Sequence, residues 1–212
     1  MTTVSVAALV VAALLAAGDW MARGRQLRRL EYICKPATVV ALLVLALALS
    51  PAPDAGARRW WFVAALAFSL VGDVLLMLPS DLFVAGLGAF LVGHLCYLAG
   101  FWAHGPGGLA LAVAAVIVVA AVAPVGFRIL KALGRERPLQ VPVAAYMVVI
   151  SAMLATALAT GNVVAGVGAA LFVSSDTMIA WNRFVRPFGA ADVAIMVTYH
   201  LGQAALVLSL LR

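Results

Sequence analysis

Two aspartates, Asp73 and Asp176, lie inside long apolar stretches of the sequence. An ionised aspartate at the centre of a membrane-spanning helix costs about 2.5–3.5 kcal/mol, so packing gives little reason to keep either one. Two neighbouring carboxyl groups can divide chemical work, because one donates a proton while the other, ionised, stabilises a developing cation. The alternative is a structural role with hydrogen bonds or ion pairs. The candidate partners for that role are Ser69, Ser174, Ser175, Lys35 and Arg183.

Other polar residues are predicted at the same depth as the two aspartates. Each aspartate precedes the end of its predicted span by five residues, which places it roughly 7.5 Å inside that end. The residues expected in the same layer are Tyr146, Lys35, Asn182 and Arg183. We predict that this layer lies close enough to the lipid headgroups to receive a phosphate. For Lys35 and Arg183, the alternative is an interface anchor whose charged end reaches the headgroups.

Two histidines occupy the middle of predicted spans. His94 is followed one turn later by Tyr97, and His200 by Gln203. Neutral, hydrogen-bonded imidazoles inside a bundle are the structural alternative. A zinc site of two histidines and two aspartates is chemically permissible, but no HxxxH or ExxxH pair places two ligands on one helix face. We therefore predict no metal and no cofactor, and GxSxG, P-loop, Rossmann and CxxC motifs do not occur.

The elements that must position these residues are membrane-spanning helices. The chain is 66% hydrophobic and only 10% charged, against about 25% charged residues in soluble domains. Apolar runs of roughly 17 to 25 residues recur, and each is long enough to cross about 30 Å of hydrocarbon. We predict an all-α polytopic bundle in a single transmembrane domain, residues 1–212. Its eight spans cover 4–20, 35–49, 60–78, 83–102, 109–127, 141–160, 162–181 and 190–210.

The first span could instead be a signal peptide, because residues 4–17 are apolar and rich in alanine. It lacks the basic region that begins such peptides, so we expect it to be retained. Cys34 and Cys96 fall near a helix end and in mid-span respectively, and we interpret both as packing residues.

Basic residues predict the orientation of the spans. The connections after spans one, three, five and seven hold eleven of the fourteen Lys and Arg residues, and Arg58, Arg59 and Arg212 are the remainder. Basic loops stay in the cytoplasm, so we predict a multi-pass inner-membrane protein with both termini outside. The net charge of +6 then faces anionic lipid, and we expect membrane lipids but no nucleic acid as partners. The sequence gives no indication of oligomeric state.

The two halves of the chain resemble each other. The segment around Asp73 is similar to the one around Asp176, and a span with a central histidine follows each, His94 after 21 residues and His200 after 24. A proline also begins spans two and six, at Pro36 and Pro142. We predict two parallel four-helix repeats, with chance similarity among Ala-, Leu- and Val-rich helices as the alternative.

Several of these motifs resemble the YhhN family of lysoplasmalogenases, from about residue 30 to the C-terminus. The most specific are the segments 69–77 and 172–180 around the two aspartates and the Gly-His-x-x-Tyr motif at 93–97. The resemblance implies an eight-span enzyme that hydrolyses the vinyl ether bond of lysoplasmalogens, releasing a fatty aldehyde and glycerophospho-choline or -ethanolamine. It implies Asp73 and Asp176 as the catalytic pair and a lysophospholipid as the substrate. The resemblance places Lys35, Tyr146, Asn182 and Arg183 around the pair. We also expect His94, Tyr97 and His200 to contact the substrate, although His200 does not map onto the family's pattern.

The residues suit that reaction. Vinyl ethers cleave by protonation of the β-carbon, capture of the oxocarbenium ion by water and collapse of the hemiacetal. We expect Asp176 to be the anion, because Arg183 lies two helical turns further along the same face, and Asp73 to be the acid. The alternatives are a metal-dependent membrane lipid hydrolase and a proton-coupled transporter or lipid-binding protein.

Overall fold

The computed structural model describes residues 1–53, 55–103, 105–135 and 137–211. Within that part all regular secondary structure is helical, and eight of the helices are long and apolar enough to cross a membrane. The protein is therefore an integral multi-pass membrane protein, which confirms the predicted all-α, eight-helix class. The helices are α1 Thr3–Gly24, α2 Arg28–Ala48, α3 Gly56–Met77, α4 Phe83–Trp102, α5 Gly108–Ala132, α6 Arg137–Ala159, α7 Val163–Ala180 and α8 Ala191–Leu208. Three short turns, η1 Leu133–Arg135, η2 Trp181–Val185 and η3 Ser209–Leu211, continue α5, α7 and α8.

Helix α4 has the predicted bounds, whereas most of the others extend past their apolar runs. Helix α2 begins at Arg28 and not at residue 35, so that Pro36 lies inside it. Helix α5 continues to Ala132, beyond the predicted end at residue 127. In both cases the extra turns carry basic side chains, which lower the hydropathy without interrupting the backbone hydrogen bonds. Hydropathy therefore marked the apolar core of each helix and not its ends.

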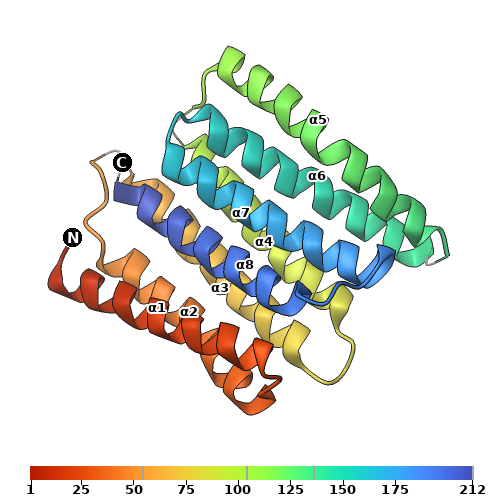
Figure 1. Cartoon of the computed structure of the whole chain (residues 1–212). Helices are drawn as coiled ribbons and strands as arrows, with labels where there is room; N and C mark the ends of the chain where they lie inside the picture. The colour runs from red at the N-terminus through yellow and green to blue at the C-terminus, as the bar shows by residue number, and fades with distance from the viewer. Residues whose placement is uncertain (54, 104, 136, 212) are drawn as a thin grey trace.

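Helices adjacent in sequence pack as antiparallel neighbours, except for α4 and α5, and α4 and α8 lie at the centre of the bundle (Figure 1). Helix α4 contacts α3 and α6, and α8 contacts α1, α2 and α7. Helix α5 lies at the periphery against α6 and η2. Large side chains fill the core, including the fully buried rings of Phe62, Tyr97, Phe101 and Phe172.

Helices α7 and α8 approach each other closely at two glycines. A Cβ atom on Gly168 would lie 2.8 Å from the Leu206 amide nitrogen, and one on Gly202 would lie 3.0 Å from the Phe172 amide nitrogen. Backbone atoms thus occupy the space that a larger residue would need. This contact fixes α7, which carries Asp176, against α8, which carries Tyr199.

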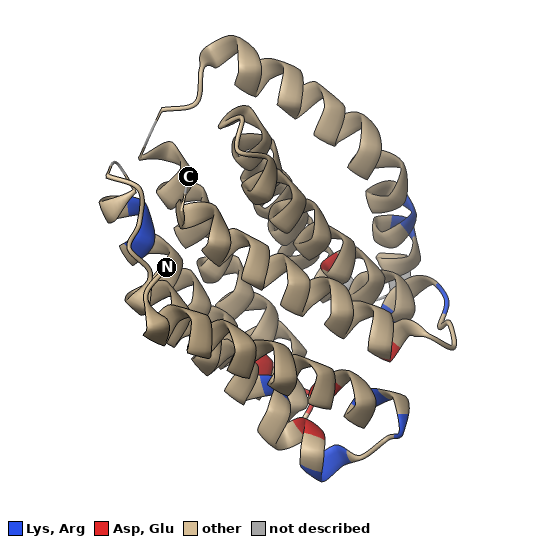
Figure 2. Ribbon diagram, turned by 60° about the vertical axis from the view of Figure 1, so that its left-hand side comes forward, with Lys and Arg blue, Asp and Glu red and all other residues tan. Residues whose placement is uncertain are grey.

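Most basic residues lie toward the ends of the helices, and long stretches between them carry no Lys, Arg, Asp or Glu (Figure 2). Charged residues inside the bundle are therefore rare among the mostly apolar residues of the helices. Lys35 and Asp73 are both buried there, as is Asp19.

Candidate active site

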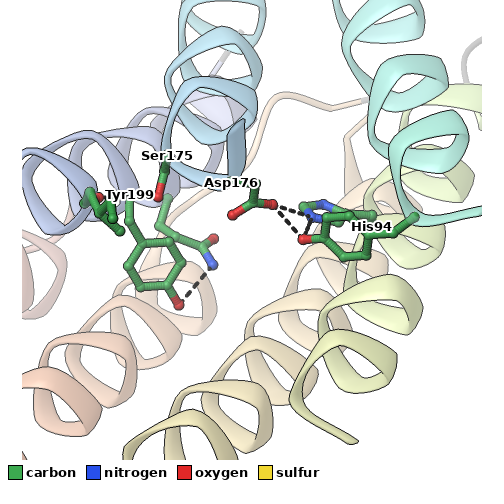
Figure 3. A network of polar contacts seen from close by, with 7 residues as sticks. His94, Ser175, Asp176 and Tyr199 are labelled. Atoms are coloured by element: carbon green, nitrogen blue, oxygen red, sulfur yellow. Dashed lines mark hydrogen bonds and ion pairs between the residues drawn. The ribbon is translucent and has the colours of Figure 1, made fainter. Parts of the chain in front are cut away.

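Asp176 on α7 is held by side chains from two other helices (Figure 3). Tyr146 on α6 donates its hydroxyl hydrogen to Asp176 Oδ2. His94 Nε2 on α4 lies 3.3 Å from the same oxygen and 2.8 Å from the Tyr146 hydroxyl. Both contacts involve Oδ2, which leaves Oδ1 as the oxygen of Asp176 available to a ligand.

Asp176 and Tyr146 lie in the wall of an apolar cavity of about 460 Å³. Side chains of α3 to α7 and of η2 surround it, and most of them are aliphatic or aromatic. The lining runs along the helices from Phe83 and Phe184 at one end to Leu154 and Ala170 toward the other. A volume in the usual range for small-molecule sites, with few polar groups in an apolar wall, is typical of a ligand pocket.

Asp73 on α3 belongs to a second polar network. Lys35 Nζ lies 3.0 Å from Asp73 Oδ1, and the Tyr199 hydroxyl donates to Oδ2 at 2.7 Å. Gln203 donates to the Tyr199 hydroxyl at 3.4 Å and accepts a hydrogen bond from Tyr97. All five residues are at most 3% exposed, and none of the five lines the cavity.

An aromatic ring lies between the two networks. The Phe172 centroid is 4.7 Å from that of His94 and 5.3 Å from that of Tyr199, edge to face in both cases. In the part of the chain that the structure describes, no hydrogen bond or ion pair joins Asp73 to Asp176. The carboxylates thus occupy two linked sites with different surroundings.

The structure contradicts the contact between Arg183 and Asp176 on which the predicted roles of the aspartates were based. Arg183 does not pair with Asp176, because its guanidinium donates to Asp81 Oδ2 at 2.8 Å. Residues Trp181–Val185 form a π-helical turn, which holds more residues per turn and rotates Arg183 off the expected face. Inside the bundle, Lys35 forms an ion pair with Asp73. Asp73 therefore lies beside a lysine, whereas Asp176 lies beside a tyrosine and a histidine.

Two other predicted site residues point elsewhere. Asn182 accepts a hydrogen bond from the Phe188 amide at 3.1 Å and so orders the connection before α8. His200 Nδ1 accepts a hydrogen bond from the Trp20 indole at 3.1 Å, next to α1. Among the described residues, no three His, Cys, Asp or Glu side chains gather where they could hold one metal ion. The four residues considered as zinc ligands are thus divided among three places.

Sequence reasoning missed Tyr199 and Trp20 as partners of Asp73 and His200. Tyr199 and Gln203 are one turn apart, and this spacing could have indicated that their side chains lie together on one face of the helix. No comparable signal joins Trp20 to His200, because 180 residues separate them.

At the rim of the cavity, Asp81 lies outside the helices. The hydrogen bond and the charge of Arg183 lower the pKa of the Asp81 carboxyl. Asp81 is therefore ionised at neutral pH.

The chain is similar in sequence to several proteins named lysoplasmalogenase. The chain is 39% identical to the human protein named lysoplasmalogenase TMEM86B over 70% of its own length and 62% of the relative's. It is 35% identical to the rat protein of that name over 84% of its length and 71% of the relative's. A Mycobacterium bovis protein named lysoplasmalogenase is 37% identical over 78% of the chain and 66% of the relative.

The chain thus spans about two thirds of the length of these relatives. No solved structure matches it significantly. Residues 30–210, which include both aspartate networks and every residue of the cavity wall, match the family described as YhhN. The protein belongs to the YhhN family.

Proposed function

We propose that this protein is a membrane lysoplasmalogenase, which hydrolyses the vinyl ether bond of a lysoplasmalogen to a fatty aldehyde and a glycerophospho-choline or -ethanolamine. The observation that supports it most is the Asp176 carboxyl group in the wall of an apolar cavity inside a membrane protein. The names of the curated relatives support the same reaction.

The shape and polarity of the cavity suit a single-chain amphiphile. The aliphatic lining from Ile150 to Leu154 suits a hydrocarbon tail. Asp176 lies between that region and the rim formed by Phe83 and Phe184. A lipid with its tail in the cavity and its headgroup at the rim would therefore present the bond next to its glycerol to Asp176.

The reaction can be written with Asp176 as the proton donor. The protonated carboxyl gives its proton to the β-carbon of the vinyl ether, and the C=C electron pair forms the new C–H bond, leaving an oxocarbenium ion. The resulting carboxylate stabilises that cation. Water then adds to the carbon bonded to oxygen, and its released proton returns to the carboxylate. The hemiacetal finally breaks its C–O bond to the glycerol while its hydroxyl proton passes to the glycerol oxygen, giving aldehyde and alcohol.

Tyr146 and His94 orient the carboxyl by binding Oδ2, so that Oδ1 carries the proton toward the substrate. We assign Asp73 a positioning role, because its ion pair with Lys35 and its hydrogen bond from Tyr199 fix α2, α3 and α8 together. Phe172 lies between Tyr199 and His94 and transmits that packing to the site.

The test is the release of fatty aldehyde from a lysoplasmalogen by the purified protein in detergent. Asp176→Asn should lower kcat by about a hundredfold or more, since general acid catalysis typically contributes 10²–10⁴. Asp192→Asn, a matched change at an exposed aspartate, should leave the rate unchanged. Absence of aldehyde from the unmodified protein, or full activity of Asp176→Asn, contradicts the proposal.

A further inference from the structure

Arg183 lies at the rim of the cavity, where two of the lining residues hold it. Its guanidinium carbon is 4.2 Å from the ring centroid of Phe83 and 5.6 Å from that of Phe184. Both rings belong to the cavity wall. The charge therefore stands directly beside the apolar space and is held in place by cation–π contacts.

The ion-pair partner of Arg183 is an exposed side chain. The Arg183–Asp81 contact is 2.8 Å long, and the two side chains are 38% and 70% exposed. Exposed ion pairs contribute little, because water competes for both charges. A guanidinium has donors arranged to bind a phosphate in bidentate fashion, which is a stronger interaction than an exposed pair with one carboxylate oxygen.

The distances along the helix fit a lipid whose reactive bond is at Asp176. Arg183 follows Asp176 by seven residues, or about 10 Å along the axis at the helical rise. Ala170 lies in the opposite direction from Asp176, toward the apolar end of the cavity. Tail, reactive bond and phosphate would then meet Ala170, Asp176 and Arg183 in that order.

We propose that the Arg183 guanidinium binds the phosphate of the lysophospholipid and that Asp81 competes for it, so that substrate binding exchanges one anion for the other. The proposal rests on the proposed function for the identity of the lipid. Asp81 is ionised at neutral pH and so competes with a full charge. Removal of Asp81 should strengthen binding of a phosphate-bearing lipid, and it should do so only while Arg183 is present.

The experiment measures the dissociation constant of a saturated 1-alkyl lysophospholipid, which has no vinyl ether, by calorimetry in maltoside detergent. Asp81→Asn should tighten binding by up to about fivefold, the range of an exposed ion pair. Arg183→Gln should weaken it by about tenfold or more, as expected for loss of a charge-assisted phosphate contact. The double variant should match Arg183→Gln. Asp192→Asn and Arg186→Gln, matched changes at exposed positions, should leave the constant unchanged.

A 1-alkyl glycerol without phosphate provides the second arm, and its affinity should not respond to either substitution. Unchanged or weaker binding by Asp81→Asn, or unchanged binding by Arg183→Gln, overturns the proposal. The ligand cannot be cleaved, so this result is independent of the aldehyde assay. If aldehyde is released normally but the substitutions do not change binding, only the proposed anion exchange is wrong. If binding changes as expected but no aldehyde is released, only the proposed hydrolysis is wrong.

Discussion

At the residue scale, the ion pair between Lys35 and Asp73 places two charges where neither meets water. The two side chains are 4% and 1% exposed. Removal of one member leaves an uncompensated charge, so Lys35→Met should cost about 3–5 kcal/mol of unfolding free energy. Lys35→Met combined with Asp73→Asn should recover most of that loss, because the neutral amide still accepts a hydrogen bond from Tyr199. Denaturant unfolding of the three variants in detergent measures both effects, and a double variant no more stable than Lys35→Met would contradict them.

A second residue-scale prediction concerns Tyr146, which orients the acid. Tyr146→Phe removes the hydroxyl that binds Asp176 and His94 and keeps the ring against them. The kcat for aldehyde release should fall by about tenfold or more, while KM changes little because the cavity wall is unchanged. Tyr32→Phe, at an exposed tyrosine, is the matched control. An equal fall in kcat for both variants would show that Tyr146 has no specific role.

The residue types of the site were predictable, and their partners were only partly so. Asp73 and Asp176 could be singled out from the sequence, because a carboxyl group in an apolar span is energetically costly whichever helices the span packs against. Which cation pairs with which acid depends on helix rotation, and the π-helical turn at Trp181–Val185 changed that rotation locally. Spacing along one helix therefore predicted a contact for Arg183 that tertiary structure does not make.

At the element scale, the contact between α7 and α8 determines where Asp176 lies. Gly168→Ala would bring a methyl group to within 2.8 Å of the Leu206 amide nitrogen. The helices must separate, and overpacking of this kind costs about 1–3 kcal/mol. We expect a lower Tm and a lower kcat for aldehyde release. Gly88→Ala, where the added Cβ meets nothing within 4 Å, should leave both unchanged. A Gly168→Ala protein with the original Tm would show that α8 can shift freely.

The helices themselves were the most predictable elements, because a long apolar run in lipid has to satisfy its backbone hydrogen bonds internally. Their ends were less predictable. Basic side chains at Arg28 and Lys131 continue the helices α2 and α5 into the interface, where hydropathy gives no further signal.

At the scale of the whole molecule, the second, third and fourth helices of the two halves make corresponding contacts. Helix α3 packs on α2 and α4 as α7 packs on α6 and α8, and α2 contacts α8 as α6 contacts α4. Each aspartate takes one partner from the second helix of its own half and one from the last helix of the other half. Asp73 has Lys35 and Tyr199, whereas Asp176 has Tyr146 and His94. This pattern supports the predicted duplication, and it means that both halves contribute partners to each aspartate.

Hydrogen bonds near the helix ends show which connections between helices lie at the same end of the bundle. Thr2 bonds to the Ala48 carbonyl and Ala52 to the Leu210 carbonyl, which places both termini beside the α2–α3 connection. Asp81, after α3, meets Arg183, after α7, at the opposite end. That end carries most of the basic residues, so the positive-inside rule predicts that it is cytoplasmic.

Single cysteines introduced after replacement of Cys34 and Cys96 by alanine would test this orientation. Gly107→Cys, exposed between α4 and α5, should react with a membrane-impermeant maleimide in intact cells. Ser80→Cys, exposed between α3 and α4, should react only after the membrane is opened. The reverse pattern would place Arg183 and the cavity rim outside. With the predicted pattern, the rim faces the inner leaflet, and a lysolipid reaches Asp176 from that leaflet with its phosphate at the level of Arg183.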